Sequence, residues 1–286
     1  ISFDTRSIKK NNIFFAIKGN NTDGNKFIPE AIKKGCKIFV TEKRRNHFQD
    51  GILYIYTNNI RRLLAETAFK IYNKKPENLI AVTGTNGKSS VADFYYQILK
   101  LNNKKVASIG TLGVKSKNIN LNLSNTTIDP IKLAKILSNL KSQKIENVIM
   151  EASSHGLKQN RLDGLKFNSG IFTNLSQDHL DYHKNLKNYL DAKLYLFENL
   201  IQKRGNIITD QSIPEFKNIK KITINKKLKL HTLNDKKNNL ELLSHNLKGE
   251  SQFLRVKLNN SIRVLNLNLI GKIQFKNVLM AIIAAK

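Results

Sequence analysis

The sequence predicts an α/β protein: a small N-terminal α/β unit, then a larger domain with a mostly parallel sheet, flanking helices and a phosphate-binding loop. From residue 79 onward, short apolar runs alternate with amphipathic stretches, which is typical of strands joined by helical crossovers. Within residues 79–101, a glycine-rich loop stands between an expected strand and an expected helix. A polar stretch that includes Pro76 precedes this region, and we divide the chain there into domains 1–76 and 77–286.

The first domain contains the elements of a small sheet with covering helices. Its apolar runs predict strands at 13–17, 37–41 and 53–56, and helices at 27–34 and 60–72. Gly35 directly follows the first of these helices, where a glycine commonly ends a helix. We therefore expect residues 1–72 to fold as a separate α/β unit.

The second domain continues the alternation, and its signal weakens beyond Gly205 to short β-rich runs between Lys/Asn loops. Apolar residues at 133, 136, 137 and 140 share one face of a predicted helix. Further strands are expected at 147–150, 170–173 and 261–270, and further helices at 186–200 and 274–286. Strands that alternate with helices in this way favour a parallel sheet covered on both faces.

Composition narrows the class of protein. The chain has 286 residues, one cysteine and a formal net charge of +28. Its lysines are scattered rather than gathered in one stripe, so we do not expect nucleic acid as the main partner. The apolar run 278–285 is too short to span a bilayer, and no basic-then-apolar leader opens the sequence. We expect a monomeric cytoplasmic protein that does not bind membranes.

The loop Gly84–Ser90 has the composition of a phosphate cradle. An apolar run at 79–82 precedes it, and a helix with apolar residues at 91, 94, 95 and 98 follows it. Backbone N–H groups at such a loop and helix start attract anions, while Lys88 neutralises charge and Ser89 offers a hydroxyl to magnesium. The generic pattern GxxxxGK[ST] is not met, because Val82 stands at its first glycine. The alternative is a glycine-rich turn with a solvated lysine.

Glu151 follows the apolar run 148–150 and is expected at the carboxyl edge of the sheet, where open α/β folds bind ligands. There it could complete the coordination of a magnesium ion, since hard cations take oxygen ligands. The alternative is a surface carboxylate at a strand end. Ser153, Ser154 and His155 follow, but the G-x-S-x-G elbow of serine hydrolases is absent.

Two later positions also carry possible chemistry. In residues 172–183, two acids and two histidines, Asp178, His179, Asp181 and His183, directly follow an expected strand. They could form a metal or phosphate site. The alternative is a polar loop in which Asp181 caps the next helix. Without further cysteines, zinc is disfavoured. Lys193 lies on an apolar helix face, where burial would lower its pKa and allow conversion to a carbamate. The alternative is that its ammonium reaches solvent along that face.

Together these segments resemble the Mur ligases, and among them the MurE-type branch. The resemblance rests on Asp4-Thr5-Arg6 with the run 14–24, on Asn125-Thr126-Thr127, on residues 152–161 and 172–183, and on Ala192-Lys193. Folylpolyglutamate synthetases share the ATP loop but lack this combination. The resemblance implies a UDP-binding N-terminal domain and an ATP-binding central domain.

Functional residues follow from the resemblance position by position. ATP would bind Gly84, Thr85, Asn86, Gly87, Lys88, Ser89 and Ser90, with Asn277 on the adenine side. One Mg²⁺ would be held by Ser89 and Glu151, and a second by His179 and a carbamylated Lys193. The catalytic residues would be Lys88, Glu151, His179 and Lys193. The UDP-linked substrate would contact Phe3, Thr5, Asn20, Asn21, Thr22, Asn125, Thr126, Thr127, Ser153, Gln159 and Arg161. Ile273-Gln274 departs from the family's usual Phe-Asn, which puts that nucleotide contact in doubt.

The implied reaction is ATP-dependent amide formation during synthesis of peptidoglycan precursors. UDP-MurNAc-L-Ala-D-Glu would be activated as an acyl phosphate and joined to a diamino acid, either meso-diaminopimelate or L-lysine. The alternatives are a ligase of the folylpolyglutamate synthetase kind and a non-catalytic nucleotide-binding fragment. Mur ligases carry a third domain that binds the amino acid, and this sequence ends within the helix expected before it. We therefore expect residues 1–286 to be inactive alone.

Overall fold

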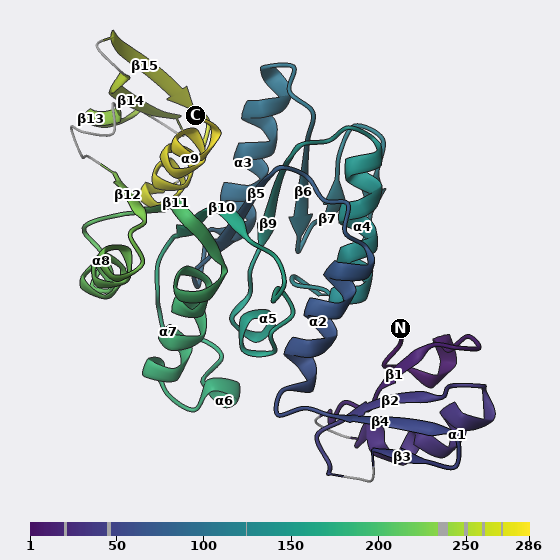
Figure 1. The fold of residues 1–286 in the computed structure, drawn as a ribbon. Helices are drawn as coiled ribbons and strands as arrows, with labels where there is room; N and C mark the ends of the chain where they lie inside the picture. The colour runs from purple at the N-terminus through teal and green to yellow at the C-terminus, as the bar shows by residue number, and fades with distance from the viewer. Residues whose placement is uncertain are drawn as a thin grey trace. The chain divides into compact units, whose positions relative to one another are not determined.

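The computed structural model describes residues 1–19, 22–44, 47–123, 125–233, 240–248, 251–258, 261–269 and 271–286 (Figure 1). The chain forms two compact units. The first contains residues 1–74, 129–138 and 159–165, and the second contains residues 75–128, 139–158 and 166–286. The division predicted from the sequence lies after residue 76, and by their contacts the segments 129–138 and 159–165 group with residues 1–74.

The first unit is built on a four-stranded sheet of order β1-β2-β4-β3, in which only β3 is antiparallel. Alternation along β1 sends Phe14 to one face, where it packs with Ala31 and Phe39, and Phe15 to the other, where it packs with Leu64. Its elements are η1 (Thr5–Ser7), β1 (Ile13–Phe15), η2 (Gly24–Phe27), α1 (Ile28–Lys33), β2 (Ile38–Thr41), β3 (Phe48–Gln49), β4 (Ile52–Tyr56) and α2 (Ile60–Ile71).

The second unit is built on an eight-stranded sheet of order β12-β11-β10-β5-β9-β6-β7-β8, in which every pairing is parallel except those of β7 with β6 and with β8. This confirms the predicted mostly parallel sheet. Its strands are β5 (Asn78–Thr83), β6 (Val106–Gly110), β7 (Gly113–Lys115), β8 (Asn120–Leu121), β9 (Asn147–Glu151), β10 (Phe167–Phe172), β11 (Ile201–Thr209) and β12 (Lys229–Thr232). A separate antiparallel sheet contains β13 (Leu240–Lys248), β14 (Ser251–Leu258) and β15 (Ser261–Leu267).

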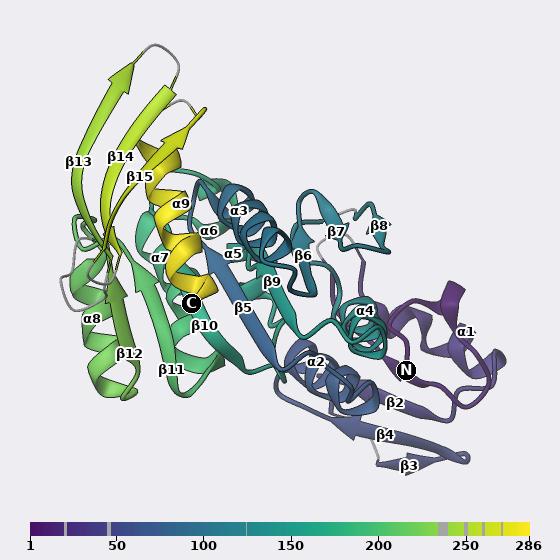
Figure 2. The same cartoon turned by 90° about the horizontal axis from the view of Figure 1, so that it is seen from above.

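Helices cover both faces of the large sheet. The helices of the second unit are α3 (Lys88–Leu101), α5 (Ser154–Lys158), α6 (Leu180–His183), α7 (Leu186–Tyr195), the π-helical turn η3 (Leu196–Leu200), α8 (Phe216–Asn225) and α9 (Lys272–Ala285), while α4 (Pro130–Ser142) begins in the first unit and ends in the second. Helices α3 and α9 lie side by side (Figure 2) and share a core with Ile171 of β10. The next residue, Phe172, faces Phe197 of η3, with ring centroids 6.1 Å apart. Both faces of β10 are therefore buried, as its apolar composition indicates.

Some elements differ from the sequence prediction. The helix expected at 186–200 changes to a π-helical turn at Leu196, and β6, β11 and α8 were not predicted. The single strand expected at 261–270 is one of three in the small antiparallel sheet. None of the helices in the described ranges is both long and apolar enough to cross a membrane.

Candidate active site

The loop between β5 and α3 depends on two glycines. Gly84 has φ +146°, and a Cβ there would lie 1.9 Å from the Thr173 hydroxyl. Gly87 precedes the first turn of α3 with φ +88°, and a Cβ there would lie 2.7 Å from the Asn277 side chain. Only glycine fits such positions without displacing a neighbour. The loop backbone can therefore run close to its neighbours and leave the N-terminus of α3 open to an anion.

The segment that follows β10 fixes the shape of this loop. The Thr85 N–H donates to the Asn174 carbonyl (2.9 Å), and the Asn86 N–H donates to Asn174 Oδ1 (3.0 Å). The Thr173 hydroxyl donates to the Asn86 carbonyl (2.6 Å), and the Ser176 N–H donates to Thr85 Oγ1 (3.0 Å). These hydrogen bonds restrict the conformation of the loop, which lowers the entropy cost of binding a ligand there.

Two lysines converge on the same carbonyl of the loop. Lys193 Nζ donates to the Gly84 carbonyl (2.7 Å), and Lys88 Nζ donates to the carbonyls of Gly84 (3.0 Å) and Thr85 (2.8 Å). Lys193 is only 1 % exposed and lies 4.2 Å from the centroid of the Tyr189 ring. Burial, and then the charge of Lys88, lower the pKa of Lys193 to about 6; burial also lowers the pKa of Lys88. At pH 7 the amine of Lys193 is therefore largely unprotonated.

Glu151 lies beside the helix start as the last residue of β9. It is 3 % exposed, and its Oε1 accepts hydrogen bonds from the Ser89 hydroxyl (2.9 Å) and the Thr111 N–H (2.8 Å). The Thr111 hydroxyl donates to Oε2 (3.2 Å). The sequence places Ser89 and Glu151 62 positions apart, and the strand order brings them into contact at one edge of the sheet.

Three predicted substrate residues of the second unit, Thr126, Thr127 and Ser153, are linked to Glu151 directly or through one neighbour. The Thr127 hydroxyl donates to the Glu151 carbonyl (3.0 Å) and accepts from the Ser153 N–H (2.9 Å). Thr126 Oγ1 lies 3.0 Å from Thr111 Oγ1. Asn125 directly precedes this pair in the chain. A substrate group at Thr126 would therefore lie close to the carboxylate of Glu151.

Five aromatic and imidazole rings gather beside the loop. His179 is exposed, has φ +52°, and lies with its ring centroid 4.9 Å from that of His155. His183 is buried, and its Nε2 lies 3.0 Å from the Ser154 hydroxyl. Burial lowers the pKa of His183 to about 4, so this ring is neutral at pH 7. Tyr182 and Tyr189 complete the cluster, and the Tyr189 hydroxyl donates to Thr85 Oγ1 (3.3 Å).

Helix α9 brings Asn277 to the loop. Asn277 is 2 % exposed, lies against Gly87, and donates through Nδ2 to Gln274 Oε1 (3.3 Å). Gln274, which departs from the family pattern, thus orients the predicted adenine-side amide, whereas Ile273 is exposed.

The remaining predicted substrate residues belong to the first unit. Phe3 is partly exposed at a cavity of about 400 Å³, and Thr5 is buried with its carbonyl accepting from Lys34 Nζ (2.9 Å). Arg161 donates twice to Gln159 Oε1 (3.1 and 2.8 Å). The Thr22 carbonyl accepts from the N–H of Gly19 (2.8 Å). Asn20 and Asn21 lie outside the described residues.

The residues at the loop suit a nucleotide with magnesium. Ser89 and Glu151 offer oxygen ligands in contact with each other, and the two glycines leave space that a Cβ would fill. Within the part of the chain that the structure describes, no three His, Cys, Asp or Glu side chains form a metal cluster. A metal here would therefore depend on Ser89, Glu151 and ligand oxygens.

Sequence reasoning missed Thr111 and the specific role of Asn174. Thr111 follows β6, which was not predicted, and Asn174 was included only in a general polar stretch. The position of Thr111 after a strand end was the available signal, because carboxyl ends of parallel strands share one edge.

Comparison with known proteins adds independent findings. Residues 82–285 match the Mur ligase middle domain, and residues 1–77 match the Mur ligase family, catalytic domain. The UDP-N-acetylmuramoyl-L-alanyl-D-glutamate--2,6-diaminopimelate ligase of Rickettsia montanensis is 41 % identical over 289 residues. That match covers 99 % of this chain and 60 % of the relative, so the chain spans about 60 % of the relative's length.

Solved structures of Mur ligases and related enzymes resemble this fold. A UDP-N-acetylmuramoyl-L-alanyl-D-glutamate--2,6-diaminopimelate ligase superposes with a TM-score of 0.85 at 25 % identity, over 99 % of this chain and 58 % of that one. The FPGS–AMPPCP complex reaches 0.62 at 14 % identity over 79 % of this chain and 62 % of that one, which indicates a shared fold only.

Proposed function

Because the chain belongs to the Mur ligase family, we propose that it provides the UDP-substrate and ATP sites of a ligase that joins 2,6-diaminopimelate to UDP-MurNAc-L-Ala-D-Glu. The contact between Ser89 and Glu151 at the start of α3, beside Lys88, carries this proposal. The relatives' names supply the substrates, and the matched length, 99 % of this chain, supports their transfer. Of the two diamino acids expected from sequence, the relatives favour diaminopimelate.

ATP with Mg²⁺ would bind at Gly84–Ser90 and supply the phosphoryl group that activates the substrate carboxylate as an acyl phosphate. The loop amides and Lys88 would orient the phosphates, and Ser89 and Glu151 would provide oxygen ligands. Phosphoryl transfer depends mainly on positioning and charge neutralisation, which fits a site without a protein nucleophile. Asn277 would contact the adenine side, held by Gln274.

We also propose that Lys193 carries a carbamate in the working protein and, with His179, serves a second magnesium ion. Its unprotonated Nζ would add to CO₂, which forms an N–C bond and releases one proton. The carbamate is anionic and would interact favourably with Lys88 across the Gly84 carbonyl that both amines now share. The test is ¹³C NMR after incubation with ¹³C-bicarbonate: a carbamate signal should appear in the wild type and in Lys220→Arg, and be absent in Lys193→Arg. An unchanged signal in Lys193→Arg would refute the assignment.

Ligand-induced shifts in melting temperature test the main proposal. UDP-MurNAc-L-Ala-D-Glu and Mg-ATP should each stabilise the protein by an amount that grows with concentration, and a folate should not. Stabilisation by folate alone would favour the folylpolyglutamate synthetase kind of ligase. Stabilisation by ATP alone would favour a nucleotide-binding module.

Turnover is a separate question, since the matched relatives extend well beyond this chain. We propose that residues 1–286 bind both ligands but release no phosphate above background with diaminopimelate. A water-excluding, closed site protects an acyl phosphate and aligns the amine, and the unmatched region of the relatives is the candidate for that role. Steady phosphate release by residues 1–286 that depends on diaminopimelate would contradict this.

A further inference from the structure

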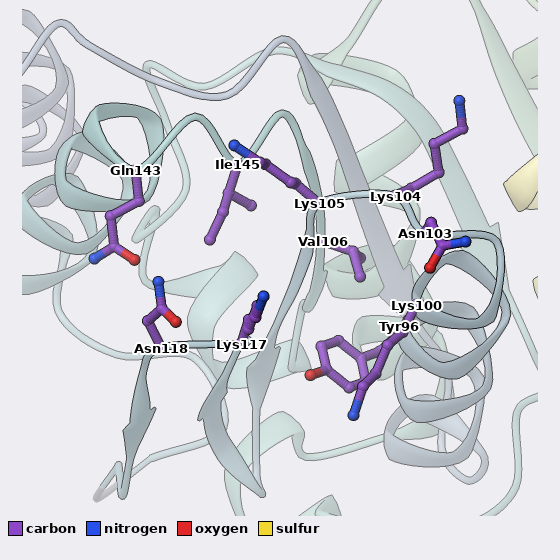
Figure 3. A pocket seen from close by; sticks show the side chains of 10 residues that line it. All are labelled: Tyr96, Lys100, Asn103, Lys104, Lys105, Val106, Lys117, Asn118, Gln143 and Ile145. Atoms are coloured by element: carbon purple, nitrogen blue, oxygen red, sulfur yellow. The ribbon is translucent and has the colours of Figure 1, made fainter.

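A second concave site lies at the amino edge of the large sheet, away from the nucleotide loop at the carboxyl edge. It is a cavity of about 690 Å³ near the start of β6 and the residues before β9 (Figure 3). Its lining consists of Tyr96, Lys100, Asn103, Lys104, Lys105, Val106, Lys117, Asn118, Gln143 and Ile145. We call it the lysine cavity. None of these residues belongs to the candidate active site.

Two local structures build the lysine cavity. The carbonyls at the end of α3 are already paired, since the Asn102 N–H donates to Ile98 (3.2 Å) and the Lys104 N–H donates to Leu99 (2.9 Å). The lysines after the helix are therefore not needed to cap it. In the β7–β8 hairpin, Ser116 and Ile119 are joined by two hydrogen bonds, which fix Lys117 at the tip.

All charged residues that line this cavity are positive. Four of its ten lining residues are lysines and none is acidic. Among the described residues, none of these four ammonium groups takes part in an ion pair, whereas nearby Lys115 pairs with Asp93 (2.8 Å). Figure 3 shows Lys100, Lys105 and Lys117 on three separate segments around the cavity, and the side chain of Lys104 extends away from them. Such a cluster concentrates positive potential and attracts anions.

Gln143 adds a second, independent feature. Its Oε1 is buried and has no hydrogen-bond partner among the described residues, while its Nε2 donates to Asn139 Oδ1 (3.1 Å). In Figure 3 this amide points toward Asn118 across the cavity. A buried acceptor without a partner costs free energy, and a hydroxyl donor from a ligand would satisfy it.

We propose that the lysine cavity binds a small phosphorylated molecule with free hydroxyl groups, of the class of nucleoside or sugar polyphosphates. The lysines would neutralise the phosphates, Gln143 Oε1 would accept from a hydroxyl, and the buried side chains of Val106 and Ile145 would pack against the ring. The volume lies within the range typical of small-molecule sites. This site is separate from the ligase reaction and does not depend on it.

Calorimetry in a Lys88→Ala background tests the proposal, because that change weakens binding at the nucleotide loop. The probes are ATP and inorganic triphosphate. Both should still bind, and Lys105→Gln with Lys117→Gln should weaken each at least about ten-fold, as expected for lost charge-assisted contacts. The control, Lys220→Gln with Lys221→Gln on the exposed face of α8, removes the same charge and should leave both affinities unchanged.

Gln143→Met then separates the two kinds of contact. It should weaken ATP several-fold and leave triphosphate unchanged, because only ATP carries the hydroxyl groups of a ribose. No binding of either probe to a folded Lys88→Ala protein would overturn the proposal. Equal losses in the cavity and control double variants would also overturn it, since binding would then reflect overall charge. If Lys88→Ala weakens binding at the nucleotide loop while both probes still bind the lysine cavity, the two sites are shown to be separate.

Discussion

Lysines at the two edges of the large sheet are held in opposite ways. At the carboxyl edge, Lys88 and Lys193 donate to loop carbonyls, and burial lowers the pKa of both. At the amino edge, the lysines of the lysine cavity are exposed and, within the described ranges, form no ion pairs. An enclosed lysine loses hydration that carbonyls only partly replace, whereas an exposed one keeps it. Changes at the carboxyl edge should therefore have larger effects.

The largest effect is expected for Gly87→Ala. The left-handed backbone costs about 1–2 kcal/mol for a residue with a Cβ, and contact with Asn277 adds about 1–3 kcal/mol of overpacking. The free energy of unfolding, measured in urea, should fall by their sum. Gly51→Ala is the matched control, because Gly51 has φ +75° but a Cβ added there would meet nothing within 4 Å. Equal losses in both variants would show that Asn277 does not restrict the loop.

The second-largest effect is expected for Lys88→Ala. It should reduce the affinity for Mg-ATP about 10- to 100-fold, because it removes a charge-assisted contact with the phosphates. Calorimetry measures this directly, with Lys220→Ala as the control of equal charge. Unchanged affinity in Lys88→Ala would mean that the loop does not bind the phosphates.

A smaller effect is expected at Asp210, directly after β11. Burial raises the pKa of its carboxyl, but Lys276 Nζ at 2.6 Å and the Ser212 N–H at 2.9 Å outweigh this, and the pKa is lowered overall. The resulting stability is present above the unfolded pKa of about 3.9 and is lost as pH falls through the lower folded value. Asp210→Asn should lower the free energy of unfolding by about 1 kcal/mol at pH 7 and remove that part of the acid dependence. Urea titrations at pH 7 and in acid check this, and identical acid profiles would contradict it.

The smallest effect is expected at the amino edge. Lys105→Gln with Lys117→Gln should change the free energy of unfolding by less than about 0.5 kcal/mol, as exposed substitutions usually do. Urea unfolding without phosphate in the buffer measures it. A loss above about 1 kcal/mol would show that these lysines support the fold rather than a ligand.

The sequence predicted best what depends on local pattern. The strand, loop and helix around Gly84–Ser90 follow from an apolar run, turn formers and helical spacing. Glu151 was expected at the carboxyl edge of the sheet because it follows an apolar run, and there it contacts Ser89 at the start of α3. For Lys193 the helix face left two alternatives open, burial of the amine or an ammonium that reaches solvent, and the structure shows the side chain buried.

What the sequence left open depends on pairings between distant segments. The support that Asn174 gives the loop requires β10 to lie beside β5, and strand order is not encoded in a local pattern. Residues 129–138 and 159–165 pack with the first unit through contacts across long sequence separations. His179 was predicted as a metal ligand, and its exposed position beside His155 leaves that role a prediction.

The discontinuity of the first unit has a consequence for the order of folding during synthesis. Residues 1–74 pack against segments that are synthesised later. Gly164 lies so close to α2 that a Cβ added to it would be 3.0 Å from Glu66, and Asp163 lies 3.7 Å from Arg62. Domains generally fold as they leave the ribosome, N-terminal first. Helix α2 therefore lacks these contacts until residue 164 has emerged, which is after residues 75–128 and 139–158 of the second unit have been translated.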